Sequence, residues 1–551
     1  MRIALGQINP TVGDIPGNLD LCVDFARRAA ARSADLVVFP ELALTGYPPR
    51  DLVEKRGFIQ RSEAAVENLA SATKDLPLAV IVGYVGSSHS ETGKQATNCA
   101  AVIRSGEILL RQVKMLLPTY DVFDEERNFV PGERQSLWKA DQADIALTIC
   151  EDAWNDKEFW SRPLYPRDPV RELMERGASM LISINASPYY QEKRRLRHDM
   201  FRAIAQRHGV PVVVVNQVGG NDQVVFDGSS FVMDRAGNII ASAASFREDL
   251  VIADTDAGEG DRNANIPHEC EAIYEALVLG TRDYIRKCGF RKVLIGLSGG
   301  IDSSLTAAIA VDAIGRENVH GVGMPGPFSS DHSVADAREM ARRLGIRFDL
   351  VSITSAYEEM LRTLKPVFGG LAADVTEENI QSRLRGLTLM SLSNKFGALV
   401  LTTGNKSEIS VGYCTLYGDM CGGLAVISDV PKTLVYELSR VANRRHHDAI
   451  PESVFVKPPS AELRPDQKDS DSLPPYDVLD AILRLYVEDF RGVHEIAEEL
   501  RLPLELVRDV ALKVDRNEYK RQQAAPGLKV TSKAFGIGRR FPIAQKYLEN
   551  E

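Results

Sequence analysis

Residues 293–310 read VLIGLSGGIDSSLTAAIA, an apolar run followed by a glycine-rich loop and then by a segment of small and apolar residues. The run predicts a strand and the last segment predicts a helix, and the alternation continues in NVHGVGMP, SVADAREMARRLG and RFDLVSI. Such alternation indicates an α/β fold with a doubly wound parallel sheet, whose ligands bind beyond the carboxyl ends of the strands. Because a glycine-rich loop there can hold an anion with its backbone N–H groups, we expect a phosphate site.

The first half of the chain alternates in the same way between β-rich apolar runs and amphipathic segments. IALGQI, DLVVFPEL and LAVIVGYV predict strands, and LDLCVDFARRAAARS predicts a helix. This pattern predicts a separate layered α/β domain. The polar, turn-rich stretch DAGEGDRNANIPHECEA, residues 256–272, indicates a boundary near residue 260. We predict two domains, residues 1–258 and 259–551.

Length and charge restrict the kinds of function. A chain of 551 residues is too long for one ordinary core. Its net charge of −10 opposes a broad electrostatic grip on nucleic acid or on an anionic membrane, so a small-molecule substrate is expected. Seven scattered cysteines do not resemble a disulfide framework, and the first residues lack a signal-peptide pattern. These features predict a cytoplasmic protein.

Residues 457–477, KPPSAELRPDQKDSDSLPPYD, contain many Pro and Asp residues and few apolar ones. This composition predicts a mobile loop. Together with the glycine-rich segment YGDMCGG at residues 417–423, the loop is expected to close over a nucleotide and exclude water.

Three residues at the ends of predicted strands could perform amide hydrolysis together. Glu41 follows DLVVFP, Lys114 follows ILLRQV and Cys150 follows DIALTI. A Cys becomes a nucleophile when a base takes its proton or a cation stabilises the thiolate, and a Lys can stabilise an oxyanion. Taken singly, however, each residue is more often a buried cysteine, a strand-end lysine or a solvated carboxylate.

The surrounding segments make the catalytic interpretation stronger. FPELALTGYPP, KMLLPTYDVFDEERNF and ICEDAWN resemble the three signature segments of the nitrilase, or carbon–nitrogen hydrolase, superfamily over residues 1–255. The resemblance implies a four-layer α-β-β-α sandwich in which Glu41 is the general base, Lys114 the oxyanion stabiliser and Cys150 the nucleophile. It also places an acidic residue beside these three. Glu125 matches that position, although Asp124 and Glu126 are its neighbours.

Resemblance to the glutamine-dependent branch of this superfamily implies a glutamine site. Tyr120, Ser187 and Lys193 stand at the matching positions. A tyrosine ring can pack on the aliphatic part of glutamine while polar groups select its amino acid head. By spacing alone, Ser187 could equally be a turn residue before Pro188, and residues 193–197 could be the solvated face of a helix.

The loop SGGIDSS, residues 298–304, resembles the pyrophosphatase loop of N-type ATP pyrophosphatases, which cleave ATP between its α and β phosphates. It has neither a Walker sequence nor a dinucleotide-fold glycine pattern. The resemblance implies that Asp302 also binds Mg²⁺. It assigns ATP binding to Gly296, Leu297, Ser298, Gly299, Gly300, Ile301, Asp302 and Ser303. Enzymes that share this loop adenylate different acceptors, so the loop alone does not identify the substrate.

Longer stretches resemble the NAD synthetases: residues 324–337, 378–394, 401–440 and 516–536. The resemblance assigns Thr403 and Lys432 to ATP. It assigns Asn379, Glu408 and Lys520 to the substrate deamido-NAD, with Glu408 also beside Mg²⁺, which takes oxygen ligands. Without the resemblance, Glu408 could be an ordinary helix residue. One departure is Leu416, since shorter relatives often have Lys before Tyr-Gly-Asp, and no phosphate contact is assigned to it.

Together the two halves imply one reaction. ATP adenylates the carboxylate of deamido-NAD, and ammonia released from glutamine attacks the activated acyl group, which gives NAD, AMP, pyrophosphate and glutamate. The resemblance further implies an ammonia tunnel between the domains and a homo-oligomer. The alternatives are another glutamine amidotransferase built on an ATP pyrophosphatase, or a binding protein with degraded sites.

Overall fold

The computed structural model describes residues 1–88, 93–141, 143–265 and 267–547. Contacts divide the chain into two compact units, Met1–Pro267 and His268–Glu551. Each unit contains its own sheets and its own core, as the length and the two sets of alternating segments led us to expect.

The first unit is built from two β-sheets. In one the strand order is β15-β14-β1-β2-β3-β4-β5, and in the other it is β13-β12-β9-β8-β7-β6, with β10 and β11 paired as a separate hairpin. The strands are β1 (Arg2–Gln7), β2 (Leu36–Val38), β3 (Ala79–Ser87), β4 (Ala96–Arg104), β5 (Glu107–Val113), β6 (Leu137–Lys139), β7 (Asp144–Ile149), β8 (Met180–Asn185), β9 (Val212–Asn216), β10 (Val218–Asn221), β11 (Val224–Asp227), β12 (Phe231–Met233), β13 (Ile239–Ser242), β14 (Asp249–Asp254) and β15 (Glu259–Gly260). The helices are α1 (Ile15–Ala31), α2 (Arg56–Thr73), α3 (Glu125–Asn128), α4 (Pro169–Glu175) and α5 (Lys193–His208), with 3-10 turns η1 (Arg50–Glu54) and η2 (Cys150–Ala153).

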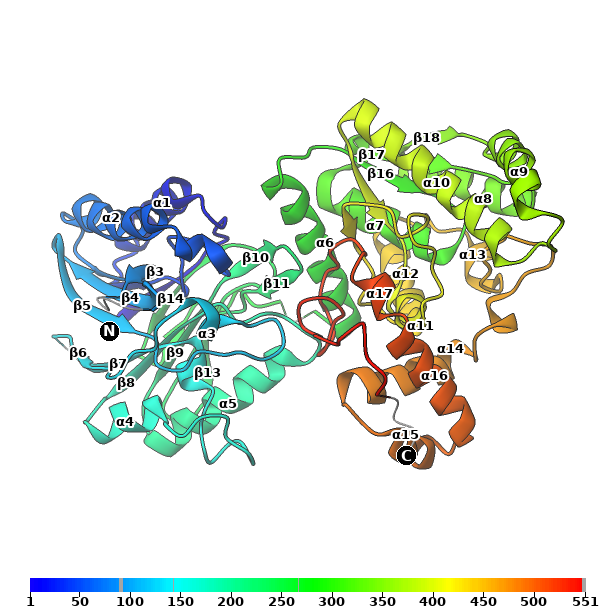
Figure 1. The fold of residues 1–551 in the computed structure, drawn as a ribbon. Helices are drawn as coiled ribbons and strands as arrows, with labels where there is room; N and C mark the ends of the chain where they lie inside the picture. The colour runs from blue at the N-terminus through cyan, green and yellow to red at the C-terminus, as the bar shows by residue number, and fades with distance from the viewer. Residues whose placement is uncertain (89–92, 142, 266, 548–551) are drawn as a thin grey trace. The chain divides into compact units, whose positions relative to one another are not determined.

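Three hydrophobic layers hold these elements as a four-layer sandwich. Between the sheets, one layer joins Ile3, Leu5 and Val38 to Leu147, Ile182 and Val213. On one outer face, α1 and α2 pack on the first sheet through Phe25, Ala26, Val66 and Leu69. On the other, α4 and α5 pack on the second sheet through Leu173, Phe201 and Ile204. Figure 1 shows α1 and α2 on one side and α4 and α5 on the opposite side, which confirms the predicted α-β-β-α arrangement.

The first unit extends past the predicted boundary at residues 258 and 259. The strand β15 pairs with β14, and the Asp261 carboxylate accepts hydrogen bonds from Arg32 at 2.7 Å and from the Ile252 backbone at 2.8 Å. Residues 259–261, which the sequence pattern assigned to the second domain, are therefore hydrogen-bonded into the first unit. Composition marks this stretch as a turn region but does not reveal its pairing.

The second unit contains a parallel sheet in which the chain starts at the middle strand. The order is β18-β17-β16-β19-β20, so the chain runs outward from β16 to one edge and then returns to build the other side. This reversal between β16 and β19 is the topological switch point of a doubly wound sheet, as predicted, and it leaves a crevice at the carboxyl ends of the strands. The strands are β16 (Val293–Gly296), β17 (Val319–Gly323), β18 (Arg347–Leu350), β19 (Leu399–Thr402) and β20 (Leu424–Ala425).

The helices of the second unit cover this sheet and form a second small core. The helix α10 covers one face through Leu389 and Leu392, and the later helices α14, α15 and α16 pack together around Leu479, Ile496 and Val510. The helices are α6 (Glu269–Lys287), α7 (Ile301–Ile314), α8 (Asp331–Leu344), α9 (Thr354–Phe368), α10 (Val375–Phe396), α11 (Lys406–Val411), α12 (Lys432–Arg445), α13 (Glu452–Val456), α14 (Tyr476–Leu483), α15 (Val493–Leu500), α16 (Leu504–Arg516) and α17 (Glu518–Arg521), with shorter turns η3 (Arg316–Asn318), η4 (Asp469–Asp471) and η5 (Arg484–Glu488).

The predicted loop at residues 457–477 is irregular over most of its length. Residues 457–468 form neither helix nor strand, η4 follows, and α14 begins at Tyr476, so the last two residues of the predicted loop are helical. The mobility of the loop stays a prediction.

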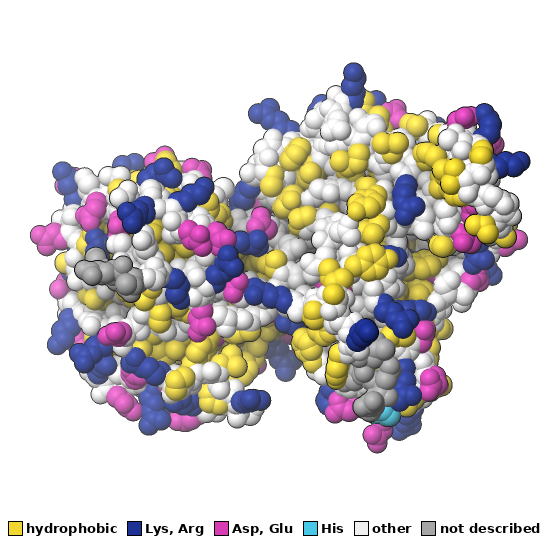
Figure 2. Space-filling model, in the orientation of Figure 1, with side chains coloured by type: hydrophobic (Ala, Val, Ile, Leu, Met, Phe, Trp, Pro, Cys, Tyr) yellow, Lys and Arg dark blue, Asp and Glu magenta, His cyan; other side chains and the backbone are white. Residues whose placement is uncertain are grey.

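Neither the described helices nor the surface in Figure 2 has the features of a membrane-spanning or broadly basic protein. None of the helices among the described residues has the length and apolar character needed to cross a membrane. On the face of the first unit that Figure 2 shows, basic and acidic side chains are interspersed. A surface of mixed sign provides weaker steering of a polyanion than a broad basic patch would.

An ion pair lies inside the first unit. Arg197, in α5, has no exposed area, and its guanidinium donates to the Asp227 carboxylate at 2.7 Å. Asp227 ends β11 and is also buried. Arg197 is therefore not part of a solvated helix face, which was the alternative for residues 193–197. Removing one partner of a buried ion pair leaves the other charge uncompensated in the interior.

We expect Asp227→Ala to destabilise the first unit by about 3–5 kcal/mol, because the Arg197 charge would remain buried without its partner. All three tryptophans, Trp138, Trp154 and Trp160, lie in this unit, so their fluorescence in urea reports its unfolding. Asp141→Ala is the control. It breaks the exposed pair with Arg104 at 2.7 Å, which should change stability by less than about 1 kcal/mol. Equal losses in the two variants would contradict the prediction.

Candidate functional site

A buried ion cluster lies at the strand ends of the first unit. Glu41 follows β2, Lys114 follows β5, and the Lys114 Nζ lies 2.7 Å from Glu41 Oε1 and 2.8 Å from Glu125 Oε1. Both Glu41 and Lys114 are fully buried. Burial lowers the pKa of the Lys114 ammonium, but the carboxylates of Glu125 and Glu41 outweigh this effect and raise that pKa well above its ordinary value. Lys114 therefore stays a charged, fixed hydrogen-bond donor.

Cys150 begins the turn η2 directly after β7. It is 4% exposed, and its φ of +45° is unusual for a residue with a side chain. Burial raises the pKa of its thiol, the Glu41 carboxylate raises it further, and the Lys114 ammonium opposes both effects. The thiol is thus neutral at rest and needs a base to become a nucleophile.

The structure distinguishes between the three neighbouring acidic residues of the segment YDVFDEERNF. Glu125 is buried and accepts hydrogen bonds from Lys114 and, at 2.8 Å, from the Tyr47 hydroxyl, whereas Glu126 is exposed and Asp124 is only half-buried. Burial raises the pKa of the Glu125 carboxyl to about 7 against the effect of the Lys114 ammonium. Glu125 is the acidic residue that joins the cluster.

The three residues matched to a glutamine site lie around this cluster. The Tyr120 hydroxyl donates to both oxygens of Glu151 at 3.0 and 3.1 Å, and Glu151 is the residue after Cys150. The Lys193 ammonium lies 3.8 Å from the centre of the Trp154 ring, which follows η2. Ser187 is buried directly after Ala186, whose N–H donates to Glu41 Oε2 at 2.9 Å.

Several buried polar residues of this region were not singled out in the sequence. Asn98, on β4, donates from its side-chain Nδ2 to Glu41 Oε1 at 2.7 Å. Its backbone carbonyl accepts the Lys114 backbone N–H at 2.8 Å. Glu151 and Asp152 were visible in ICEDAWN as acidic residues beside the cysteine, but their partners were not. An isolated Asn in an apolar strand offers no comparable signal, because its position gives no partner until the sheet is folded.

In the second unit, a cavity of about 290 Å³ opens at the carboxyl ends of β16, β17 and β19. Residues 457–463 of the irregular segment also line it. The cavity includes these candidate residues: Gly296, Leu297, Ser298, Gly299, Gly300, Ile301, Asp302, Ser303, Thr403, Glu408 and Lys432. It lies at the switch point, where the sheet topology predicts a ligand site.

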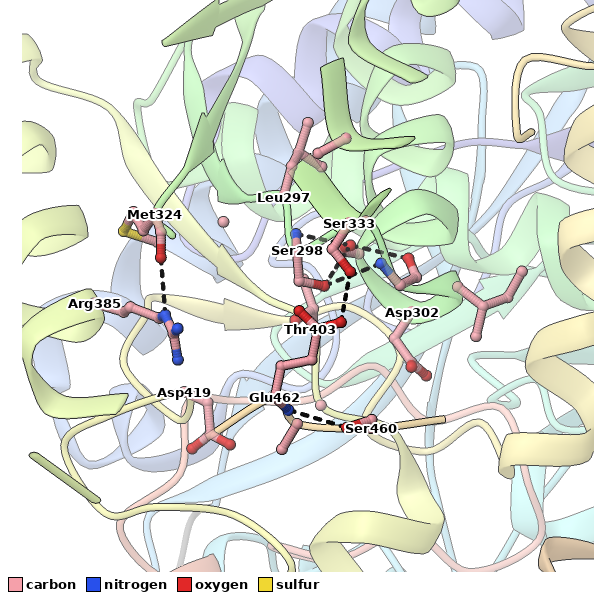
Figure 3. Close-up of a pocket in the computed structure, with 18 of the residues that line it drawn as sticks. Leu297, Ser298, Asp302, Met324, Ser333, Arg385, Thr403, Asp419, Ser460 and Glu462 are labelled. Carbon is pink, nitrogen blue, oxygen red and sulfur yellow. Dashed lines mark hydrogen bonds between the residues drawn. The ribbon is translucent and has the colours of Figure 1, made fainter. Parts of the chain in front are cut away.

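The glycine-rich loop has a conformation that depends on its glycine at residue 299. Gly299 has φ of +77°, and a Cβ there would lie 2.2 Å from the Ser333 carbonyl oxygen. The loop is closed by the Ser298 and Ser303 hydroxyls, which lie 3.2 Å apart, and it leads into the N-terminus of α7 (Figure 3). Backbone N–H groups at this helix start favour an anion.

Two carboxylates and a lysine form the charged wall of the cavity. The Lys432 ammonium donates to Asp302 and, at 3.3 Å, to Glu408, while Asn405 donates to the other Asp302 oxygen at 2.9 Å. Burial lowers the pKa of Lys432, but the Asp302 and Glu408 carboxylates raise it overall. Burial also raises the pKa of Glu408, against the Lys432 ammonium.

The carboxylates of Asp302 and Glu408 are suitable magnesium ligands only together with other oxygen donors. Within the part of the chain that the structure describes, no group of three or more His, Cys, Asp or Glu side chains could hold a metal ion. Mg²⁺ commonly uses one or two carboxylates together with substrate phosphates and water. Asp302 and Glu408 fit that set when a nucleotide supplies the remaining oxygens.

Two residues matched to deamido-NAD lie elsewhere. Asn379 and Lys520 are not among the described residues that line the cavity. Both contact one loop: Asn379 accepts a hydrogen bond from Thr415 at 2.8 Å, and the Lys520 ammonium donates to the carbonyls of Gly412 and Cys414, each at 2.8 Å. Asn379, in α10, and Lys520, in α17, therefore contact the same loop, residues 412–415.

The carboxylate of Glu462 holds the irregular segment, residues 457–468, over the cavity. Glu462 accepts from the hydroxyls of Ser330 at 3.0 Å and Ser333 at 2.7 Å and from the Lys457 ammonium at 2.7 Å. Figure 3 shows Glu462 pointing toward Ser333 and the glycine-rich loop. The segment is thus held over the cavity by the polar contacts of Glu462, which suits a cover that opens and closes.

Comparisons with known proteins agree for both units. Residues 2–262 match the carbon-nitrogen hydrolase family, and residues 273–524 match the NAD synthase family. The glutamine-dependent NAD(+) synthetase of Synechocystis is 47% identical over 99% of each chain, and that of Thermotoga maritima is 43% identical over 100% of this chain and 99% of its own. The structure of glutamine-dependent NAD+ synthetase from Acinetobacter baumannii in complex with ADP has a TM-score of 0.77 and 40% identity, and it covers 100% of this chain and 99% of that one. With both units matched in order and relatives aligned over their full length, the chain belongs to the family of glutamine-dependent NAD(+) synthetases.

Proposed function

We propose that this chain amidates deamido-NAD to NAD in an ATP-dependent reaction, with ammonia that it releases from glutamine. The observation that carries the proposal is the pairing, on one chain of this family, of the Glu41–Lys114–Cys150 cluster with the glycine-rich loop of the second unit. The glutaminase occupies the first unit, Met1–Pro267, and the synthetase the second, His268–Glu551.

In the glutaminase, Glu41 takes the proton of the Cys150 thiol as the sulfur attacks the side-chain amide of glutamine. The carbonyl oxygen becomes an oxyanion, which the Lys114 ammonium stabilises. As this intermediate collapses to a thioester, the departing amide nitrogen takes up the proton held by Glu41 and leaves as ammonia. Water then hydrolyses the thioester to glutamate and restores the thiol. Tyr120, Ser187 and Lys193 hold the substrate, and Lys193 pairs with its α-carboxylate.

In the synthetase, the glycine-rich loop, Thr403 and Lys432 hold ATP. Asn379, Glu408 and Lys520 hold deamido-NAD. The carboxylate of deamido-NAD attacks the α-phosphorus of ATP and pyrophosphate leaves; ammonia then attacks the acyl carbon and AMP leaves. Mg²⁺, held by Asp302 and Glu408, would offset the negative charge of the phosphates. The segment at residues 457–477 covers the site and keeps water from the adenylate.

The setting of the enzyme is also part of this proposal. We expect a homo-oligomer in the cytoplasm, acting on glutamine, ATP and deamido-NAD without nucleic acid or membrane partners. Family resemblance supports the assembly, and the scattered cysteines support a reducing compartment. Sedimentation of the purified chain would give its subunit number.

Cys150→Ala should abolish glutamine-driven NAD formation while leaving ammonium-driven NAD formation within about twofold of the parent. The reason is that only the glutamine route needs the thioester, and loss of a nucleophile in such a catalytic group costs about 10⁶-fold in kcat. The measurement is NAD formed from deamido-NAD and ATP with either nitrogen donor.

Cys22→Ala is the matched control, because Cys22 is an equally buried free cysteine of the first unit, in α1. It should leave both routes intact. Loss of the ammonium route in a folded Cys150→Ala protein would contradict the assignment of the two reactions to separate sites.

Asp302→Ala should lower NAD formation with both nitrogen donors by at least about 10²-fold, because it removes a proposed Mg²⁺ ligand and one of the two carboxylates that hold Lys432. Pyrophosphate release that depends on deamido-NAD should fall equally, while glutamine hydrolysis should persist. Asp331→Ala provides the control, since Asp331 also lies in the first turn of a helix, α8, but faces solvent. Near-normal pyrophosphate release by Asp302→Ala would exclude the proposed role of the loop.

A further inference from the structure

Asp152, two residues after Cys150, connects two chain segments of the candidate glutaminase site. Its side chain is 1% exposed. One carboxylate oxygen accepts the backbone N–H groups of Met115 and Leu116, each at 2.9 Å. These residues follow Lys114 directly. The contact therefore fixes the segment that carries the Lys114 ammonium.

The other oxygen of Asp152 faces the cysteine side. It accepts the backbone N–H of Ile149, the residue before Cys150, at 3.2 Å and the Gln135 Nε2 at 2.6 Å. Lys114 follows β5 in one sheet, and Cys150 follows β7 in the other. The Asp152 carboxylate thus ties together strand ends from two stacked sheets, next to the Gln112 side chain of β5, which donates to the Leu147 carbonyl of β7 at 2.9 Å.

We propose that Asp152 is a positioning residue that sets the distance between the Cys150 sulfur and the Lys114 ammonium. The inference rests on the glutaminase function proposed above. A carbonyl attacked by Cys150 must develop its oxyanion where Lys114 can stabilise it, and a shift of about 1 Å in such an arrangement can cost about 10²-fold in rate. Asp152 reaches neither substrate nor the reacting atoms and acts through the backbone on either side of it.

All four partners of Asp152 are N–H donors, which explains why the residue at this position is a carboxylate. An ionised carboxylate only accepts hydrogen bonds and has about four lone-pair sites, whereas an amide of the same shape must present an N–H₂ group to one pair of donors. Burial raises the pKa of Asp152 to about 6, and the Leu116 N–H and the Lys114 charge oppose the shift, so the carboxylate is mostly ionised at neutral pH. Asp152→Asn keeps the volume but disrupts one side of the connection.

The test is steady-state glutamine hydrolysis by the full-length Asp152→Asn protein. We expect kcat to fall about 10²-fold, with KM for glutamine within about threefold of the parent, because Tyr120, Ser187 and Lys193 are unchanged. Ammonium-driven NAD formation should remain normal. Asp156→Asn is the matched control: Asp156 is also buried, and it accepts the N–H groups of Glu158 at 2.9 Å and Phe159 at 3.2 Å and pairs with the Arg207 guanidinium, all outside the cluster, so kcat should hold.

Tryptophan fluorescence in urea separates positioning from folding. A first unit that stays folded with reduced kcat and unchanged KM supports the proposal. A kcat within threefold of the parent would overturn it, and so would unfolding of the first unit in Asp152→Asn, because the residue would then be only structural. If the parent protein itself failed to hydrolyse glutamine, the proposed function would fail and the hydrogen-bond connection would have no reaction to serve.

Discussion

The interaction on which the first unit depends is the contact of one buried ammonium, Lys114, with the carboxylates of Glu41 and Glu125. Removing three charged groups from water is costly, and it is tolerated only where geometry and hydrogen bonds compensate. The sandwich provides that geometry, because strand ends from its two sheets meet at one edge and Asn98, Tyr47 and the Ala186 N–H satisfy the remaining oxygens. Loosening any of these strands would leave a charge unpaired in the interior.

The second unit uses the same groups under a different constraint. Lys432 bridges Asp302 and Glu408, but each carboxylate is 18% exposed and the group faces an open cavity. Lys432 is held by two carboxylates beside this open cavity. It can therefore replace one carboxylate with a phosphate oxygen at low energetic cost, because its ammonium stays paired with the other carboxylate throughout the exchange. In the first unit, Lys114, Glu41 and Glu125 are paired with one another in the interior. In the second unit, Lys432, Asp302 and Glu408 face a cavity and are accessible to a charged ligand.

The sequence predicted most of the fold and the residues that the structure brings together at each candidate site, because both depend on local patterns. Alternating apolar runs marked the strands, and short segments around Glu41, Lys114, Cys150 and Asp302 resembled known families. Local patterns do not predict polar contacts between residues that are far apart in the sequence. Residue spacing does not reveal that Asp152 reaches across two sheets, nor that Arg197 pairs with Asp227. For Asn379 and Lys520, the resemblance suggested a role without showing that both contact the 412–415 loop.

The charge of the cluster also restricts how the cysteine can react. Lys114 is the cation among the buried carboxyl groups of Glu41, Glu125, Glu151 and Asp152, so a resting thiolate at Cys150 would add a negative charge where negative charge already predominates. In the proposed mechanism, transfer of the thiol proton to Glu41 during attack avoids that state, because the negative charge then passes from sulfur to the substrate oxygen beside Lys114. A Cys150 pKa that burial raises is compatible with that mechanism, because the thiolate then needs to form only when a carbonyl is present to accept its charge.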